Sequence, residues 1–401
     1  MKLVNQHLIK DSNMKLLYNE IYNNSGISRA QLAKLSNLSK TTVSTLIDEL
    51  INRGFVYDSG VADSNNVGRK PNSLHVKPSS YYVVVFSWIE NYINLYLMDI
   101  TGATTFELHL KLEGDDTYVS LSRKCMEEYV LTQVNREQIL GVCVVVSAMI
   151  DTVNEEIYST TLSLPKSEGM NLIASLKSTF REFPVAILED TACSAYAEKV
   201  YARVTEPDFA FINFSRGIGA TLFIRNKMVG KANGASTQFG HYSADPDGVL
   251  CACGNRGCIE AMMGESALAK MVKAEGGSPA LDRLPAITYA TLGNAALYGD
   301  AVSKKVIKEI ARVLSYGLAN LISIVNPHLI ILGGKSILLG DLFLNEINKN
   351  LKSTGFRRMV DNVEVQYSKL DSNAFLNGAM KYFFDVHYAF TKDLTNSFFI
   401  G

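Results

Sequence analysis

Residues 241–260 read HYSADPDGVLCACGNRGCIE, and this stretch carries the most specific pattern in the chain. His241 is followed by three cysteines, Cys251, Cys253 and Cys258, which lie within eight residues of one another. One imidazole and three thiolates form a four-ligand set suited to tetrahedral Zn²⁺. Because four protein ligands leave no position for an activated water, we expect a structural zinc ion. The alternative is three unligated thiols beside a packed histidine.

The cysteines outside this stretch are isolated at Cys125, Cys143 and Cys193. A local cluster of cysteines favours metal ligation in a reducing compartment over a framework of disulfides. The chain contains no run of 18 apolar residues, and its first residues lack the apolar stretch of a signal peptide. We therefore expect a cytoplasmic protein. A length of 401 residues predicts two or three domains.

Charge is distributed unevenly along the chain. Residues 1–78 contain ten Lys and Arg against six Asp and Glu, whereas the whole chain has a net charge of −1. The remaining residues therefore carry a net charge of −5. The first segment is the part suited to bind a polyanion.

Residues 14–52 are expected to form three helices. Apolar residues recur at helical spacing over residues 14–22. Ser28 and Gln31 match the capping box S-x-x-Q at the start of a short second helix. Ser39 then caps a third helix over residues 40–52. Four residues of the last two helices are expected to face inward: Ala33, Leu38, Val43 and Leu46. Two short helices joined by a tight turn are typical of a helix-turn-helix.

In a helix-turn-helix, the start of the second helix enters the major groove of DNA. The polar residues expected to contact DNA there are Ser39, Lys40, Thr41, Thr42, Ser44 and Thr45. Residues 58–72 predict a wing hairpin whose basic tip, Arg69 and Lys70, contacts phosphate or the minor groove. We expect residues 1–78 to form a winged helix-turn-helix DNA-binding domain. The alternative is a small structural or protein-binding module.

From residue 81 onward, the pattern changes to that of an α/β fold. Strands are expected at residues 82–86, 93–98 and 140–146, with helices at 167–180 and 192–200 between later strands. Here the sequence resembles the ROK family of repressors, open reading frames and kinases, and residues 241–260 match its zinc motif position by position. The resemblance implies a two-lobed actin-like fold of the sugar kinase and ribonuclease H-like type over residues 79–401.

One family motif has been lost. The ROK kinases hold ATP phosphate with a glycine-rich turn after their first strand. The resemblance aligns that turn with Ser87, Trp88, Ile89, Glu90 and Asn91. Bulky side chains replace glycines whose amides must approach the phosphate, and Glu90 would repel it. We therefore expect no catalysis.

The sugar-binding residues are partly retained. The resemblance assigns ligand contacts to Glu189, Asp190, Gln238, His241 and Glu260, of which Glu189 and Gln238 differ from the kinase pattern. Carboxylates and amides match sugar hydroxyls because each donates or accepts in a fixed direction. The alternative is a vestigial cleft that binds nothing.

A long apolar helix face over residues 306–322 is expected to belong to the core or to join subunits. A homodimer or homotetramer would suit a two-fold symmetric operator. The sequence thus predicts a non-catalytic repressor of carbohydrate metabolism that binds double-stranded DNA and is controlled by a sugar or a sugar derivative. Two alternatives stay open: a ROK sugar kinase with an added DNA-binding domain, and a regulator controlled by a protein partner.

Overall fold

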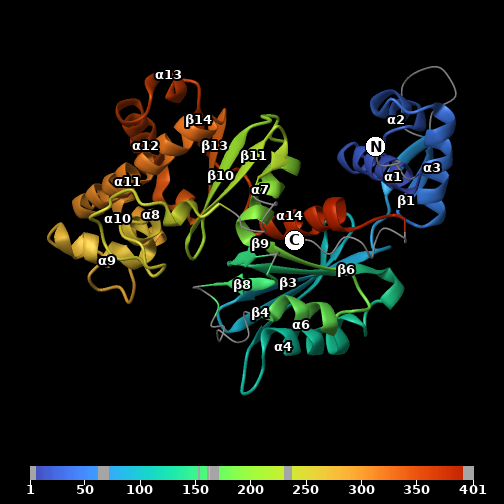
Figure 1. The fold of residues 1–401 in the computed structure, drawn as a ribbon, viewed down its shortest axis with the longest axis horizontal. Coiled ribbons are helices and arrows are strands. Elements are labelled where there is room, and N and C mark those ends of the chain that lie inside the picture. Colours follow the sequence, from blue (N-terminus) through green and yellow to red (C-terminus); the bar gives the residue numbers. More distant parts are fainter. Residues whose placement is uncertain are drawn as a thin grey trace. The chain divides into compact units, whose positions relative to one another are not determined.

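The computed structural model describes residues 6–61, 72–151, 154–159, 162, 171–229 and 237–391. The chain divides into two compact units, and Figure 1 shows the elements of each. Unit 1 contains residues 1–146, 164–188 and 379–401. Unit 2 contains residues 147–163 and 189–378.

The winged helix lies in unit 1. It consists of α1 (Gln6–Asn23), α2 (Arg29–Ser36), α3 (Lys40–Asn52) and the antiparallel strands β1 (Val56–Val61) and β2 (Asn72–Val76). Both predicted caps are present, since the Ser28 and Gln31 side chains form the capping box and the Ser39 hydroxyl accepts from the Thr42 amide at 3.0 Å. The predicted wing tip, Arg69 and Lys70, lies outside the described residues.

The core of the winged helix differs at one helix from the predicted set. Val43 and Leu46 are buried as expected. On α2, however, Leu32 is fully buried and Ala33 is partly exposed, and Leu38 in the turn after α2 is also partly exposed. Leu32 lies one helical turn after the buried Ser28, so both side chains face the core. The inward face of α2 is therefore displaced by one residue from the prediction.

A five-stranded sheet forms the centre of the rest of unit 1. Its strands are β3 (Tyr82–Ile89), β4 (Tyr92–Asp99), β5 (Thr104–Lys111), β6 (Ile139–Val146) and β9 (Val185–Glu189), in the order β5-β4-β3-β6-β9. The parallel strands β3 and β6 are buried almost throughout, which requires cover on both faces of the sheet. α4 (Tyr118–Cys125) and α6 (Leu172–Thr179) lie on one face (Figure 1).

Unit 2 repeats this arrangement of strands. Its sheet contains β10 (Phe209–Phe214), β11 (Ile218–Ile224), β12 (Lys227–Met228), β13 (Leu329–Gly334) and β14 (Glu364–Tyr367), in the order β12-β11-β10-β13-β14. In each sheet, three consecutive strands form an antiparallel meander, β3-β4-β5 in unit 1 and β10-β11-β12 in unit 2. The strand that follows, β6 or β13, pairs in parallel with the first strand of the meander. The two lobes are therefore built on one topology.

Helices cover both faces of the unit 2 sheet. Side chains alternate along β10, so that Ala210, Ile212 and Phe214 join one core cluster and Phe209 and Phe211 join another. α7 (Asp190–Val200) packs on the second cluster through Ala195. The first cluster is covered by α8 (Ile259–Met263), α9 (Glu265–Ala274), α10 (Tyr289–Leu297), α11 (Ala301–Val325), α12 (Gly340–Thr354) and α13 (Arg357–Val360).

The long apolar helix predicted over residues 306–322 is confirmed as part of α11. Its predicted apolar residues all lie in the core of unit 2: Val306, Ile310, Val313, Leu314, Leu318, Leu321 and Ile322. Because this face is buried within one chain, it is not available to join subunits.

The remaining elements are short. They are the hairpin strands β7 (Met149–Asp151) and β8 (Glu156–Tyr158), the 3₁₀ turns η2 (Arg136–Gln138), η3 (Phe239–His241) and η4 (Lys335–Leu339), and the π turn η1 (Met126–Val130). α14 (Ala374–Tyr382) continues into a second π turn, η5 (Phe383–His387). Over the described residues, no helix combines the length and the hydropathy that a bilayer crossing requires.

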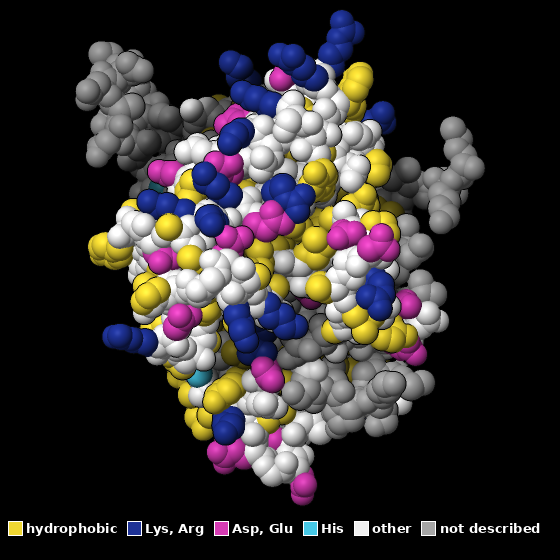
Figure 2. Space-filling view, turned by 90° about the vertical axis from the view of Figure 1, so that its left-hand side faces the viewer, with side chains coloured by type: hydrophobic (Ala, Val, Ile, Leu, Met, Phe, Trp, Pro, Cys, Tyr) yellow, Lys and Arg dark blue, Asp and Glu magenta, His cyan; other side chains and the backbone are white. Residues whose placement is uncertain are grey.

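Charged side chains of both signs are interspersed across the face shown in Figure 2. Ion pairs on α11 and α12 show the same mixing, with 3.7 Å between Lys308 and Glu346 and 2.6 Å between Arg312 and Glu309. Exposed pairs of this kind add little to stability. The apolar clusters on the two faces of the sheet therefore account for most of the stability of unit 2.

The segment predicted to replace the phosphate turn forms a closed hairpin between β3 and β4. Ile89 pairs with Tyr92, which leaves Glu90 and Asn91 as a two-residue connection. Trp88 is buried, and its indole donates to the Ser122 hydroxyl at 3.0 Å. The β3–β4 connection therefore contains no glycine, and the Trp88 ring is held against α4.

We expect Trp88→Ala to lower the free energy of unfolding by about 3–5 kcal/mol, because it removes a fully buried ring and leaves a cavity. Trp88→Phe keeps an aromatic ring and loses the indole donor, so a smaller loss of about 1 kcal/mol is expected. Circular dichroism during guanidinium unfolding measures both values. A loss below about 1 kcal/mol for Trp88→Ala would contradict the packing described here.

Candidate functional site

The first turn of α3 presents polar side chains to solvent. Lys40, Thr41 and Thr45 are exposed. Ser39 is also exposed, but its hydroxyl caps the helix and lies 2.8 Å from the Thr42 hydroxyl. The amide groups at the start of a helix carry a partial positive charge that favours phosphate. This turn can therefore contact the backbone and the bases of DNA.

One of the predicted DNA contacts is engaged within the winged helix. The Arg29 guanidinium reaches from α2 and donates to the Ser44 hydroxyl at 3.0 Å. The same guanidinium pairs with Asp48 at 2.7 Å. Arg29 thus fixes α2 against α3, and Ser44 takes part in that contact.

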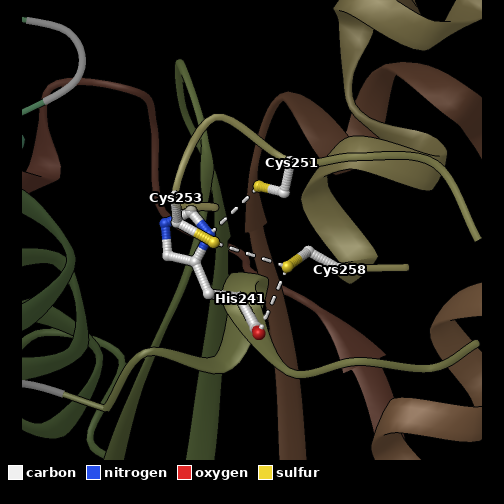
Figure 3. Close-up of side chains that lie close together, drawn as sticks. All are labelled: His241, Cys251, Cys253 and Cys258. Atoms are coloured by element: carbon white, nitrogen blue, oxygen red, sulfur yellow. Dashed lines mark hydrogen bonds between the residues drawn. The ribbon is translucent and has the colours of Figure 1, made fainter. Parts of the chain in front are cut away.

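The predicted metal ligands converge. His241, Cys251, Cys253 and Cys258 each offer one ligand atom, and these atoms lie within 4.8 Å of one another. The four side chains point toward a common centre (Figure 3). The Cys251 sulfur lies 3.6 Å from His241 Nδ1, and the Cys253 and Cys258 sulfurs are 3.7 Å apart. The cluster could hold a metal ion.

The chain around the cluster is folded tightly by backbone contacts. The Cys251 amide donates to the Asn255 carbonyl at 2.8 Å, and Ser243 forms an isolated bridge with Cys258. Gly257 has φ of +62°, and a Cβ there would lie 1.6 Å from the Asp245 carbonyl oxygen. Glycine is therefore required at this position for the cysteines to converge.

The environments of the three thiols differ. The Asn255 amide helps to lower the pKa of Cys253. Burial raises the pKa of Cys258 to about 12. A metal binds the thiolate form, so a metal at this cluster must displace the Cys258 proton, and its binding weakens as the pH falls.

Asp190 lies at the start of α7 and is surrounded by hydroxyl and amide donors. It accepts from the Thr191 amide at 2.6 Å, and the Ser215 and Ser147 hydroxyls also donate to it. Burial raises the pKa of Asp190, and these donors oppose that shift because they favour the carboxylate. The carboxylate is thus held in one orientation within unit 2.

Glu260 lies beside the turn between β10 and β11. One oxygen of its carboxylate accepts from the Ile218 amide at 2.8 Å. A Cβ at Gly217 would lie 2.2 Å from the same oxygen, so the turn accommodates Glu260 only with glycine there. The glycine turn that the sequence retains therefore positions a carboxylate in this chain.

The other predicted ligand contacts have different environments. The Glu189 side chain is buried and accepts from the Ile150 amide of β7 at 3.4 Å. The Gln238 side chain is exposed, and the backbone carbonyl of Gln238 accepts from the His241 amide at 3.0 Å. Asp190 and Glu260 thus have defined polar partners on the two sides of the β10–β11 turn, whereas Glu189 is directed to the β7–β8 hairpin.

The side chains of Thr191 and Asn213, near Asp190, were not predicted from the sequence to belong to the site. Thr191 donates to Asp190 and accepts from the Asn213 side chain at 3.2 Å, and a Cβ at Gly219 would lie 2.6 Å from its hydroxyl. An Asp-Thr pair at the start of a helix was the signal that could have identified Thr191, since both residue types favour helix starts.

A model of the ROK family matches residues 92–385, which is more than half of the chain. The chain belongs to the ROK family. A second model, described as a winged helix-turn-helix DNA-binding domain, matches residues 10–57 of this ROK protein.

Relatives of similar length carry the names of repressors. The ROK protein is 29% identical to the xylose repressor of Caldicellulosiruptor bescii, over 94% of this chain and 96% of the relative. It is 28% identical to the xylose repressor of Bacillus subtilis strain 168, over 93% and 95% of the two chains. It is 23% identical to the N-acetylglucosamine repressor of Escherichia coli O157:H7, over 92% and 91%.

Solved structures share the fold. A ROK family transcriptional regulator, described as a homologue of the E. coli MLC protein, has a TM-score of 0.77 at 20% identity and covers 94% of this chain and 97% of its own. A ROK family glucokinase from Streptomyces griseus, in complex with glucose and AMPPNP, has a TM-score of 0.60 at 21% identity and covers 75% and 98%. The expected winged helix-turn-helix and two-lobed fold are confirmed.

We expect the ROK protein, purified with its thiols reduced, to contain about one metal ion per chain. Cys258→Ser should lose the ion and unfold at a lower temperature, because a structural metal contributes to folding. Cys143→Ala removes a buried thiol elsewhere and should keep the metal. Elemental mass spectrometry and thermal unfolding measure both effects. Full metal content in Cys258→Ser would exclude this cluster as the site.

Proposed function

We propose that this ROK protein is a transcriptional repressor that binds double-stranded DNA through its winged helix and is controlled by a sugar or a sugar derivative. The observation that carries this proposal is the exposed polar start of α3, in a chain whose relatives over nine-tenths of its length are named sugar repressors. Those relatives also support a regulator that is not an enzyme.

The winged helix (α1–α3, β1 and β2), hereafter the reading head, is proposed to place α3 in the major groove. Ser39, Lys40, Thr41, Thr42, Ser44 and Thr45 are the proposed contacts, together with Arg69 and Lys70 of the wing. The exposed threonines suit base edges and phosphates, and Lys40 adds positive charge near the phosphate backbone. Two copies of the chain would match a two-fold operator, so we propose a homodimer or homotetramer.

Zn²⁺ is the metal proposed for the cluster. Tetrahedral Zn²⁺ with ordinary bond lengths holds two sulfurs about 3.8 Å apart, and a sulfur and a nitrogen about 3.6 Å apart. The corresponding separations here are 3.7 Å and 3.6 Å. His241, Cys251, Cys253 and Cys258 would hold the ion, which supplies a crosslink to the segment that ends at Glu260. Reduced thiols and a DNA partner support a cytoplasmic location.

The effector site is proposed to lie around Asp190 and Glu260, with Glu189, Gln238 and His241 as further contacts. The two carboxylates are oriented by amides and hydroxyls, which suits them to accept hydrogen bonds from a polyhydroxylated ligand. The closed hairpin at Trp88 supports binding without phosphoryl transfer, since that reaction depends on positioned phosphate contacts.

We expect Lys40→Ala to weaken binding to a duplex selected from a random library by the wild-type protein. It should also lower the slope of log affinity against log salt by about 0.9, which corresponds to one lost phosphate contact. Lys111→Ala removes an exposed lysine of β5 and serves as the control. Fluorescence anisotropy at several salt concentrations measures both variants. An unchanged slope in Lys40→Ala would place the phosphate contact elsewhere.

We expect Asp190→Asn and Glu260→Gln to abolish the effect of sugars on DNA affinity. Without sugar, the DNA affinity of each variant should stay within about threefold of the wild-type value, because neither residue belongs to the winged helix. The probes are D-xylose and N-acetylglucosamine, in parallel with a coupled ATP assay. Turnover at about 1–100 per second would refute the absence of catalysis. If every sugar leaves wild-type DNA binding unchanged, control by a protein partner is favoured.

A further inference from the structure

We infer that α14 is the element that connects the effector site to the winged helix. The chain passes from unit 2 to unit 1 between Gly378 and Ala379, within this one helix. The first part of α14 packs on the helix that begins at Asp190, and its last turn carries a lysine bound to α1. The inference rests on the proposed function for its regulatory meaning, whereas the mechanical link can be tested without DNA or sugar.

The winged-helix end of α14 is fixed by Lys381. This lysine side chain is almost fully buried, with 3% exposure. Its ammonium lies 2.5 Å from an Asp385 carboxylate oxygen, donates to the Asn19 side chain at 2.8 Å and lies 5.1 Å from the centre of the Tyr22 ring. Asn19 and Tyr22 belong to α1, so one buried charge joins α14 to the first helix of the reading head.

The chain after α14 completes the core of the winged helix. The Asp11 carboxylate of α1 accepts from the Phe390 amide at 2.5 Å. The ring centre of Phe390 lies 4.9 Å from that of Phe55, and the ring centre of Phe384 lies 4.5 Å from that of Tyr18. Tyr18 and Phe55 are almost fully buried. Residues 383–391 are therefore part of the winged-helix core although they follow it by more than 300 residues.

The other end of α14 lies against α7 in unit 2. A Cβ at Gly378 would lie 1.9 Å from the Cys193 carbonyl oxygen and 3.1 Å from the Ala197 amide. Cys193 lies one helical turn after Asp190 on α7. The backbones of the two helices are thus in direct contact at Gly378. A displacement of α7 at this point would therefore press directly on α14.

These contacts explain how a change near Asp190 reaches α1. A helix moves as a rigid element because its backbone hydrogen bonds run along its axis. α14 cannot slide along α1 gradually, since that would leave the Lys381 ammonium buried without its partners. We therefore expect α1 to follow a displacement of α14 instead of sliding past it. α1 packs on α3 in the same core, which carries the effect to the DNA-contacting turn.

Hydrogen exchange of the full chain tests the link without any ligand. Gly378→Ala separates α14 from α7, and we expect it to accelerate amide exchange in α1, over residues 14–22, by at least about fivefold. Gly355→Ala is the matched control, since a Cβ there would lie 2.4 Å from a Val360 methyl carbon of unit 2 and does not touch α14. It should leave α1 unchanged. If Gly378→Ala alters only α7 and α14, the inference is wrong.

Lys381→Met provides a second variant from the opposite end, with a neutral side chain of similar length. We expect faster exchange in α7 as well as in α1, because coupling between two sites is reciprocal. Arg357→Met removes an exposed ion pair at the same spacing, with Asp361, and should alter neither helix. If Gly378→Ala does not fold, Lys381→Met decides: unchanged exchange in α7 overturns the link.

The regulatory meaning is tested with D-xylose and the selected duplex. In Lys381→Met, D-xylose should bind with an affinity within about twofold of wild type, while its effect on DNA affinity falls at least about fivefold. Full retention of that effect would overturn the regulatory role of α14. If no sugar alters DNA binding by the wild-type protein, the proposed function fails in its effector part, and the exchange experiments still decide whether α14 joins α7 to α1.

Discussion

Strands that are buried on both faces constrain the whole molecule. β3, β6, β10 and β13 have almost no polar side chain to present to water, so each sheet must be covered by helices on both sides. In unit 2 this requirement places α11 against one face and α7 against the other. The start of α7 then brings Asp190 to the carboxyl end of β10, beside the β10–β11 turn that contacts Glu260. The candidate effector site is thus a consequence of how the sheet is covered.

The candidate ligand contacts and the hairpin between β3 and β4 belong to different units of the chain. The Asp190 and Glu260 carboxylates are oriented by backbone and hydroxyl groups in one unit. The hairpin that Ile89 and Tyr92 close lies in the other, and the resemblance to the kinases aligned this segment with their phosphate turn. The sequence of that hairpin can therefore change without altering the partners of the two carboxylates. Under the proposed function, a ligand that binds one conformation of the carboxylate-bearing unit more tightly would shift the population toward that conformation.

Features set by neighbouring residues were predictable from the sequence. Ser28, Gln31 and Ser39 cap helices through contacts within three residues, and the four metal ligands fall within 18 residues with glycines between them. Leu32 was missed because only the packing of α2 on its neighbours decides which side of a short helix is buried. Lys381, Asp11 and Phe390 were missed for a stronger reason. Their partners are more than 300 residues away, and no local pattern records such a pairing.

The dependence of the winged helix on residues 383–391 has a consequence for synthesis of the chain. A ribosome delivers the first helices long before the aromatic residues that cover Tyr18 and Phe55. Until then, the nascent reading head exposes an apolar surface and lacks the acceptor and donor pairs that close its core. Long-range contacts of this kind slow folding and extend the period in which chaperones are needed. A chain interrupted during translation would therefore carry an incomplete reading head.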